Sequence, residues 1–227
     1  MIKASSANGA TIVQSFVSAK DTYVRSGAFA NSNYGTQTTA QVKLETGTTN
    51  PSNTRESYLG FDLTGLAAGA IVDAALTLQF VDSGIGATNP TSLWNFALYG
   101  LTDDSWGETT ITWNNAPGVA GAPLATFSLQ GKGLGQTTIG SVSLLSYLLS
   151  QDSLVSLALV RTTSGAAPEG YVHAFATREN SNIAFRPTLA LTIRTAETIP
   201  APATAALLAL GLVGLGAARR RTLANAG

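Results

Sequence analysis

The sequence lacks cysteine altogether and has one histidine, one methionine and few charged residues, which form 11% of its 227 residues. Without cysteine the chain forms neither a disulfide bond nor a thiolate metal site, and the single histidine, His173, cannot supply a zinc cluster. The chain also lacks the Gly-x-Ser-x-Gly string of serine hydrolases and the glycine-rich phosphate loop. These absences exclude the common thiol, zinc-dependent and nucleotide-dependent enzymes.

The few charges are balanced. Lys and Arg total 13 residues, as do Asp and Glu. Three arginines, Arg219, Arg220 and Arg221, stand together near the C-terminus, so the rest of the chain has 10 basic and 13 acidic residues and a net charge of −3. This balance does not indicate a basic face, and we expect no nucleic-acid partner.

Apolar and polar residues alternate through most of the chain, as in strands with one buried face. The clearest alternation runs from Val72 to Phe80, where Leu76, Leu78 and Phe80 should face a core. Many short strands separated by turn-rich segments predict an all-β fold, a two-sheet antiparallel β-sandwich of jelly-roll type. The predicted strands are Thr11–Val17, Asp21–Arg25, Ala40–Glu45, Glu56–Phe61, Val72–Val81, Leu93–Leu101, Thr109–Trp113, Leu124–Leu129, Gln136–Val142, Leu154–Val160, Tyr171–Ala176 and Thr188–Arg194.

One short segment, Ser143–Gln151, has helical spacing instead, and Ser143 could cap it. We predict that this helix packs over one end of the sandwich. The leucines that recur at helical spacing are Leu144, Leu145, Leu148 and Leu149. We divide the chain into a disordered N-terminal remnant (1–10), a β-sandwich domain (11–195), a linker (196–202), an apolar helix with its arginine cluster (203–221) and a tail (222–227).

The C-terminal region carries an uncharged apolar run from Ala203 to Ala218, followed by Arg219, Arg220 and Arg221. A helix needs about 20 residues to cross roughly 30 Å of hydrocarbon, and the stretch from Ile199 to Ala218 just reaches that length. The arginines would act as a stop signal, and the positive-inside rule places them in the cytoplasm. The rest of the chain would then lie outside the inner membrane.

The order of Pro200-Ala201-Pro202, apolar helix and basic cluster resembles the PEP-CTERM sorting signal, although the Glu between the prolines is missing. The resemblance implies export, transient insertion into the inner membrane and cleavage by an exosortase-type protease, which leaves the mature protein at the cell surface or in a biofilm matrix of exopolysaccharide. The alternatives are an ordinary C-terminal anchor and a buried core helix. Residues 1–10 have no apolar core of about 7–15 residues, as a signal peptide needs, so we expect the natural start to lie upstream.

Four segments stand in the order typical of one family. The third is the most specific, because it joins Trp106-x-Glu108 to the string from Thr112 to Pro117, Thr-Trp-Asn-x-x-Pro. Residues 16–194 thereby resemble a DNRLRE-type domain, also described as carbohydrate-binding module family 96. The resemblance implies a jelly roll on surface proteins that handle polysaccharide, usually without catalytic activity. The segments are Lys20–Val24 with Asn31–Gly35, Arg55–Leu63 with Ile71–Leu78, Asp103–Pro117, and Thr177–Asn180 with Arg186–Leu189.

Some residues of these segments have both a structural and a functional interpretation. We expect Trp106 to plug a corner of the fold and Trp113 to lie in the core, in preference to stacking on a sugar. Asp21 could ligate a structural Ca²⁺, which jelly-roll binding modules often hold and which prefers carboxylate oxygens. Alternatively, Asp21 caps a strand end or pairs with Arg178 or Arg186.

A site for an acidic polysaccharide needs aromatic side chains together with Arg or Lys. We select Arg25, Lys43, Trp94 and Arg161 as candidate ligand-binding residues. The three cations lie on or beside predicted strands, where the polar face should point outward. Trp94 alternates with Leu93 and is expected to be exposed.

Catalysis has little support in the sequence. Tyr171 and His173 share a strand face and are the nearest match to the base of a polysaccharide lyase, and the acidic residues near Trp106 could suggest a glycosidase pair. We predict a non-catalytic, exported module that binds extracellular polysaccharide or is embedded in it. The alternatives are a structural surface or matrix protein without a glycan ligand, and a polysaccharide lyase or hydrolase.

Overall fold

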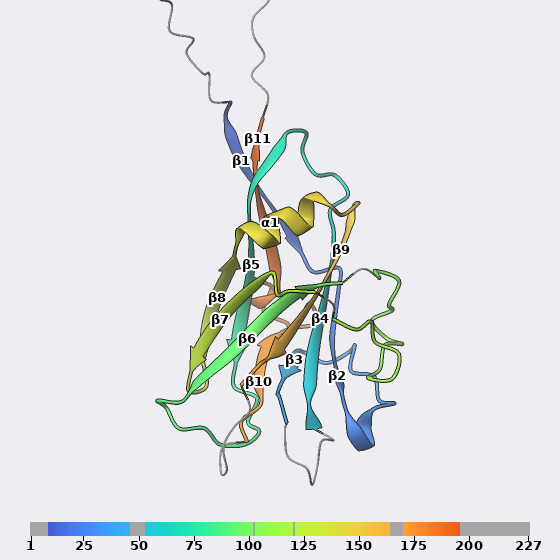
Figure 1. Cartoon of the computed structure of the whole chain (residues 1–227), viewed down its shortest axis with the longest axis vertical. Coiled ribbons are helices and arrows are strands. Elements are labelled where there is room, and N and C mark those ends of the chain that lie inside the picture. Colours follow the sequence, from blue (N-terminus) through green and yellow to red (C-terminus); the bar gives the residue numbers. More distant parts are fainter. Residues whose placement is uncertain (1–8, 46–52, 102, 120, 164–169, 196–227) are drawn as a thin grey trace, which may run out of the picture. The chain divides into compact units, whose positions relative to one another are not determined.

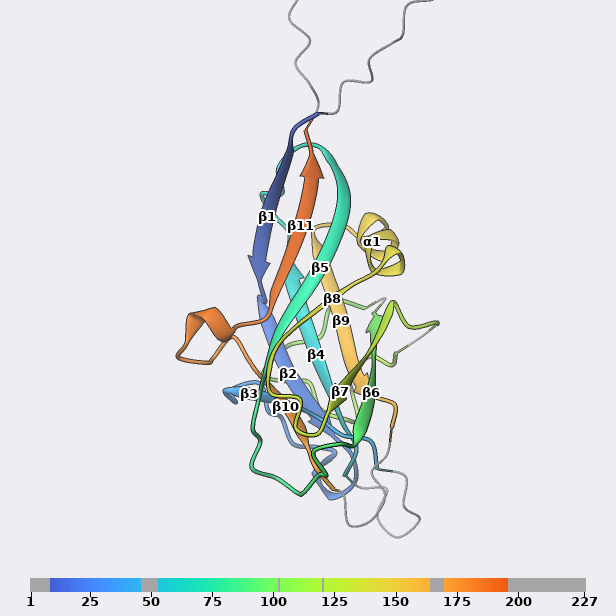
Figure 2. The ribbon, with the colours of Figure 1, turned by 90° about the vertical axis from the view of Figure 1, so that its left-hand side faces the viewer.

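The computed structural model describes residues 9–45, 53–101, 103–119, 121–163 and 170–195. Residues Thr11–Thr195 form one compact unit, and its described residues include eleven strands, one α-helix and the 3-10 turns η1 (Gly27–Phe29) and η3 (Ile183–Phe185). The strands form two sheets that face each other as the layers of a sandwich (Figure 1, Figure 2). The predicted all-β, two-sheet fold is therefore confirmed.

Both sheets are antiparallel throughout. The first sheet has the order β1 (Thr11–Val17), β11 (Thr188–Arg194), β5 (Ala70–Val81), β10 (His173–Ala176) and β3 (Thr39–Val42), with β8 (Gly135–Gly140) also paired to β5. The second sheet has the order β2 (Lys20–Arg25), β4 (Arg55–Asp62), β9 (Leu154–Arg161), β6 (Leu93–Gly100) and β7 (Ala125–Gln130).

The core lies between the two layers. Leu76, Leu78 and Phe80 of β5 are at most 1% exposed, as the alternation predicted. They belong to one apolar cluster with Leu59 and Phe61 of β4. Each side chain of this size contributes about 1.5–3 kcal/mol when it leaves water, so the inner faces supply the main driving force for folding.

One α-helix occurs among the described residues, α1 (Val142–Leu149). It begins after Ser141, whose side chain accepts a hydrogen bond from the backbone N–H of Leu144 at 2.9 Å. The prediction of Ser143 as the cap is wrong, because the extended backbone that a cap needs occurs at Ser141. Leu144 and Leu148 are buried in the core cluster, so the helix packs through the predicted face. Among the described residues, no helix has the length and apolar character needed to cross a membrane.

The segment between β6 and β7 contains successive turns where we predicted a strand at Thr109–Trp113. The N–H groups of Thr110 and Ile111 both donate to the carbonyl of Gly107, at 3.1 and 2.8 Å. The side chain of Asn115 accepts from Thr112 N at 2.6 Å and closes the next turn. The strand prediction is wrong because these local bonds satisfy the backbone without a ladder partner.

Trp106 plugs this loop onto the second sheet, as expected. It is 7% exposed, and its indole Nε1 donates to Ser156 Oγ at 2.9 Å. The Lys20 ammonium lies 4.1 Å from the centre of its ring and donates to the carbonyl of Trp106 at 2.8 Å. Trp113 is partly buried against the same small cluster, so both tryptophans have structural roles.

Candidate functional site

Three arginines lie level with one another at one end of the second sheet. Arg25 ends β2, Arg55 begins β4 and Arg161 ends β9. Arg25 of β2 is paired with Arg55 of β4. On the other side of β4, Ser57 is paired with Leu159 of β9, and the same register two residues further along places Arg161 opposite Arg55. Neighbouring strands lie about 4.8 Å apart, and like charges directly opposite each other are destabilising. We call Arg25, Arg55 and Arg161 the arginine row.

Two members of the row, Arg55 and Arg161, point between the two sheets. Arg55 Nη1 donates to Gln41 Oε1 of β3 at 2.7 Å. Arg161 Nη1 donates at 2.7 Å to the carbonyl of Tyr171, just before β10, and its Nη2 donates at 3.2 Å to the carbonyl of Leu44, just after β3. Both guanidinium groups therefore cross from the second sheet to the first, and they are nearly enclosed: Arg55 is 4% and Arg161 3% exposed.

The described hydrogen-bond acceptors of the arginine row are neutral, and Glu45, the carboxylate that acts on it, influences Arg161 only through its charge while it pairs with Lys43. Asn53 Oδ1 accepts from Arg25 Nε at 2.9 Å and from Arg55 Nη2 at 3.3 Å, so one amide oxygen lies between two guanidinium groups. Within the described part of the chain, no carboxylate forms an ion pair with the row. The Nε atoms of Arg55 and Arg161 are buried donors without a partner among the described residues. The row thus has unused donors and excess positive charge.

Electrostatics agree with this geometry. Burial lowers the pKa of Arg55, and the charge of Arg25 lowers it further. Burial also lowers the pKa of Arg161 to about 10. Both arginines remain charged near neutral pH, so an anion that enters would gain favourable interactions in a poorly solvated place.

The predicted ligand residues come together, but their exposure is different from the prediction. Lys43 is 8% exposed, and its backbone forms an isolated antiparallel β-bridge with the backbone of Arg55. The Lys43 ammonium group pairs with the Glu45 carboxylate at 2.6 Å. The expectation of outward-facing cations is wrong for Lys43 and Arg161, because Arg161 continues the inward face of Leu157 and Leu159.

Trp94 is buried, so the expectation of an exposed Trp94 is also wrong: it is 1% exposed. The guanidinium carbon of Arg161 lies 4.4 Å from the centre of its ring. Trp94 therefore makes a cation–π contact with Arg161 and does not form an exposed platform for a sugar. Arg25 is half-buried and lies 3.5 Å from the centre of the Phe29 ring.

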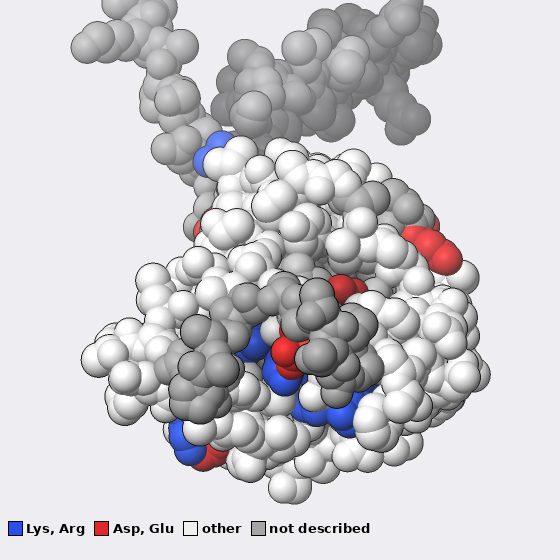
Figure 3. Space-filling model, turned by 60° about the horizontal axis from the view of Figure 1, so that its bottom comes forward, with Lys and Arg blue, Asp and Glu red and all other residues white. Residues whose placement is uncertain are grey.

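Sequence reasoning missed Arg55, the central member of the row. Arg55 begins the family segment Arg55–Leu63 and directly precedes the predicted strand Glu56–Phe61, whereas β4 itself begins at Arg55. Its position in the sequence could have indicated burial, because Arg55 lies at even spacing from Leu59 and Phe61 and therefore shares their buried face of the strand. Figure 3 shows this end of the molecule, where Lys and Arg atoms gather on a largely uncharged face with Asp or Glu atoms beside them.

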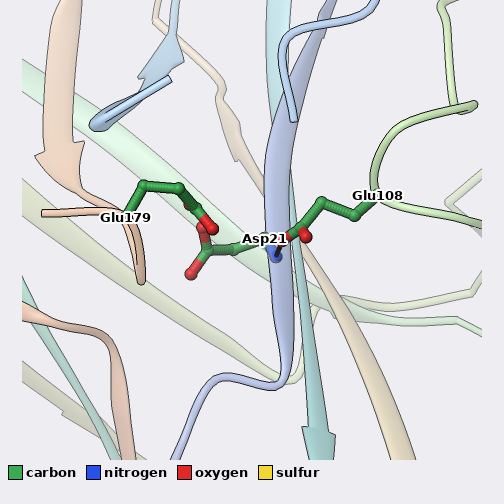
Figure 4. A group of neighbouring side chains, drawn as sticks. All are labelled: Asp21, Glu108 and Glu179. Atoms are coloured by element: carbon green, nitrogen blue, oxygen red, sulfur yellow. Dashed lines mark hydrogen bonds between the residues drawn. The ribbon is translucent and has the colours of Figure 1, made fainter. Parts of the chain in front are cut away.

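A second charged cluster joins Asp21, Glu108 and Glu179, which we call the carboxylate clasp. One carboxylate oxygen of each residue lies within 4.8 Å of the other two, and Glu108 and Glu179 approach Asp21 from opposite sides (Figure 4). Asp21 is fully buried and accepts from Ser18 Oγ at 2.6 Å and from the backbone N–H of Arg178 at 3.0 Å. The predicted capping role of Asp21 is therefore present.

The carboxylate clasp has its own cation. Arg178 Nη1 donates to Glu108 Oε2 at 2.7 Å, while Glu108 Oε1 accepts from the N–H of Asp21 at 2.8 Å. Burial raises the pKa of Asp21 to about 7. Oxygen atoms of this kind suit Ca²⁺, and the calcium site at Asp21 stays a prediction.

His173 is poorly placed for catalysis. It is fully buried, and its Nδ1 lies 3.3 Å from Arg161 Nη1, while Nε2 lies 3.1 Å from the carbonyl of Gly131. These neighbours assign the ring proton to Nε2. Burial, together with the charge of Arg161, lowers the pKa of His173 to about 4. The hydroxyl of Tyr171 donates to Asp82 at 3.0 Å and not to His173, so the pair does not form the base arrangement of a lyase.

Comparison with known proteins gives one family. A model of carbohydrate-binding module family 96 matches residues 12–193. No curated protein matches the chain. Because the family match covers most of the sequence and reaches every described strand, the chain belongs to carbohydrate-binding module family 96.

Proposed function

We propose that the domain is a non-catalytic module that binds an acidic extracellular polysaccharide through the carboxylates of the glycan. The observation that carries this proposal is the arginine row, in which two buried guanidinium groups keep unused Nε donors and have no described carboxylate partner. Family membership supports a carbohydrate ligand. The charge of the row supports an acidic one.

The physical reason is charge compensation. A buried charge is costly unless it is paired and hydrogen-bonded. The planar guanidinium group matches a carboxylate, which can accept two parallel N–H bonds. A carboxylate on the glycan would thus satisfy donors that the described protein leaves open and would reduce the repulsion between Arg25 and Arg55.

Gel retardation of the full-length chain tests this proposal. We expect retardation by a polyuronate gel and none by neutral glucan, and we expect Arg55→Gln to remove it. Arg194→Gln is the matched control, since Arg194 is exposed at the end of β11 and lies outside the row. The proposal fails if no acidic glycan retards the wild-type protein.

A structural matrix protein without a glycan ligand is the alternative. Alanine at Arg25, Lys43 and Arg161 separates the two proposals, because unchanged retention in the biofilm matrix would favour the structural role. Trp94→Ala is a poor test, since truncation of this buried side chain would leave a cavity and cost about 3–5 kcal/mol of stability. Release of reducing ends by the purified chain, lost in His173→Ala, would instead indicate a lyase or hydrolase.

We further propose that the chain is exported and sorted by its C-terminal region. The residues that support this proposal, Pro200, Pro202, Arg219, Arg220 and Arg221, lie outside the described residues. An exosortase-type protease would act near the prolines and release the module to the cell surface or matrix. Fractionation of cells tests this: full-length protein found only in the inner membrane would indicate an ordinary anchor.

A further inference from the structure

We infer that the edge strand β1 is a pairing site for a second copy of this chain, so that two molecules join their first sheets into one continuous antiparallel sheet. The inference is independent of the proposed function, because no member of the arginine row belongs to β1. It comes from the open edge of β1, from the absence of charge along this strand and from the symmetry of its sequence.

β1 presents an open and regular edge. It lies at one end of the first sheet, and β11 is its strand partner among the described residues (Figure 2). Its residues pair one-to-one with β11 along the whole strand. The Gln14 side chain holds β1 in place, because it donates to the carbonyl of Gly65 at 3.0 Å and accepts from the N–H of Ala67 at 2.9 Å. Since alternate residues of an edge strand direct their N–H and C=O groups away from the neighbouring strand, β1 offers a row of them to a further strand.

The sequence of β1 does not protect this edge. Edge strands commonly carry a charge or a proline that prevents pairing with another chain. β1 reads Thr-Ile-Val-Gln-Ser-Phe-Val and has neither. Its apolar side chains are also accessible, since Ile12, Val13 and Val17 are 41%, 68% and 50% exposed. An edge of this kind accepts a partner strand.

The other described edge strands are different. At β2, the backbone N–H of Asp21 donates to Glu108 Oε1 at 2.8 Å, so a carboxylate covers part of that edge. β3 has only four residues. β7 and β8 follow each other in the chain and contact each other at one side of the sandwich. β1 is the longest of these strands.

The β1 sequence is compatible with itself. Two antiparallel copies centred on Gln14 pair every residue of the strand, and no charged residue takes part. The pairs are Thr11 with Val17, Ile12 with Phe16, Val13 with Ser15, and Gln14 with Gln14 of the other copy. A two-fold contact requires such a self-complementary surface, so the symmetry of the strand selects a second copy as the occupant.

The same register covers apolar surface. Ile12 and Phe16 lie on the inward face of β1, because their partners on β11, Ile193 and Leu189, are fully buried. Ile12 is nevertheless 41% exposed, since β1 is the last strand of the sheet. In the pair, Phe16 of the other copy would lie opposite Ile12, and pairs of aromatic and β-branched residues stabilise antiparallel strands.

The size of the contact predicts a weak dimer. Seven residues from each copy are fewer than the roughly 20–30 residues a side of a stable interface. We therefore expect association that depends on concentration, as in a crowded matrix. A pair would carry two arginine rows, and under the proposed function it would hold two glycan chains together.

Cysteine cross-linking tests the pairing and its register, because the chain contains no cysteine. A mixture of full-length Val13→Cys and Ser15→Cys proteins should give at least about fivefold more disulfide-linked dimer than either variant alone, since identical positions lie farther apart than a disulfide can bridge. Thr138→Cys, at an exposed position of β8, is the control. Mixed with Val13→Cys, it should give only the background of the single variants. A Val13→Cys and Ser15→Cys mixture at that background would overturn the inference.

Sedimentation equilibrium without glycan supplies a second measurement. The wild type should shift from monomer towards dimer as its concentration rises, and Val13→Lys should weaken association by about tenfold or more, because it places a charge on each edge. Val13→Lys combined with Ser15→Glu should restore association, since the introduced charges of opposite sign face each other across the pair. Melting curves establish that each variant is folded.

Two sedimentation results would overturn the inference. One is a wild type that stays monomeric up to roughly 1 mM. The other is a dimer that Val13→Lys leaves unchanged, which would indicate assembly through another part of the chain or another surface. Because no glycan is present in these experiments, either result leaves the proposed function intact.

Discussion

The arginine row and the carboxylate clasp are both clusters of buried charge, but they are compensated differently. In the clasp, Arg178 pairs with Glu108 and Glu179, and Asp21 receives hydrogen bonds from Ser18 and from the Arg178 backbone, although the buried Glu179 Oε2 has no partner among the described residues. In the row, like charges face each other across strands, and the described acceptors are neutral amides and carbonyls. The carboxylate clasp has charged partners within the chain and connects loops to strands. The arginine row has no such partner among the described residues, which favours an anionic ligand.

Removal of the clasp should have the largest effect on stability. Asp21→Ala leaves Ser18 and the Arg178 N–H without their buried acceptor, and we expect a loss of about 3 kcal/mol in the free energy of unfolding. Urea denaturation measures it. The control is Asp73→Ala, an exposed aspartate of β5, which should change stability by less than about 0.5 kcal/mol. Equal effects of the two substitutions would contradict a structural role for the clasp.

Matched Arg→Gln substitutions in the two clusters should have opposite consequences. Arg55→Gln removes a like-charge contact with Arg25, so we expect weaker polyuronate binding by about tenfold, or 1.4 kcal/mol, with unchanged or higher stability. Arg178→Gln removes the partner of Glu108 and should lower stability by up to about 1 kcal/mol without changing binding. Titration with polyuronate measures the binding of both variants, and thermal melting measures their stability. Loss of binding in Arg178→Gln would contradict the separation of roles between the two clusters.

The pH dependence of stability should contain two opposing contributions. The pKa of Asp21 rises to about 7 on folding from an ordinary value of 3.8, so its contribution is complete below the unfolded pKa and is lost as the pH rises towards 7. The pKa of His173 falls to about 4 from 6.5, so its contribution is present above 6.5 and is lost as the pH falls towards 4. Each slope is at most about 1.4 kcal/mol per pH unit.

Single substitutions should reveal each contribution. In His173→Gln the remaining Asp21 term should make the protein more stable at pH 5 than at pH 7, whereas Asp21→Asn should show the reverse order. Urea denaturation at the two pH values checks both. A profile that is the same in the wild type and in both variants would mean that neither group changes its pKa on folding.

Calcium should have the smallest effect. If Ca²⁺ binds the clasp, calcium at about five times its dissociation constant adds roughly 1 kcal/mol of stability. We expect a higher melting temperature in calcium than in chelator for the wild type and no difference for Asp21→Ala. Identical melting of the wild type in both buffers would contradict the predicted site and leave Arg178 as the main cation of the clasp.

Several parts of the fold could be predicted because they depend on local pattern. Strict alternation placed Leu76, Leu78 and Phe80 in the core, and repeated leucines gave the buried face of α1. The same rule failed at Thr109–Trp113, where residues alternate as in a strand but the backbone forms turns. These turns are closed by hydrogen bonds to Gly107 and Asn115. Period-two spacing shows which side chains share a face only after a strand exists.

The candidate site was predicted in composition and not in arrangement. Arg25, Lys43, Trp94 and Arg161 could be selected as cations and an aromatic residue suited to an acidic glycan. Their polarity suggested an outward direction, whereas the face shared with Leu157 and Leu159 carries Arg161 inward. Arg55 could not be recognised as the centre of a row, because the row exists only through the pairing of β2, β4 and β9.

The sequence by itself determined an all-β chain with a specific family pattern, since alternation and motif strings are local properties. Only the tertiary structure decided that three arginines far apart in the chain lie side by side at one end of the second sheet, with the Trp94 ring against Arg161. The physical reason is strand register: hydrogen-bonded pairing selects which residues become neighbours, and charge alone does not. The same register leaves the Nε atoms of Arg55 and Arg161 without partners among the described residues, and the proposed recognition of an acidic glycan depends on them.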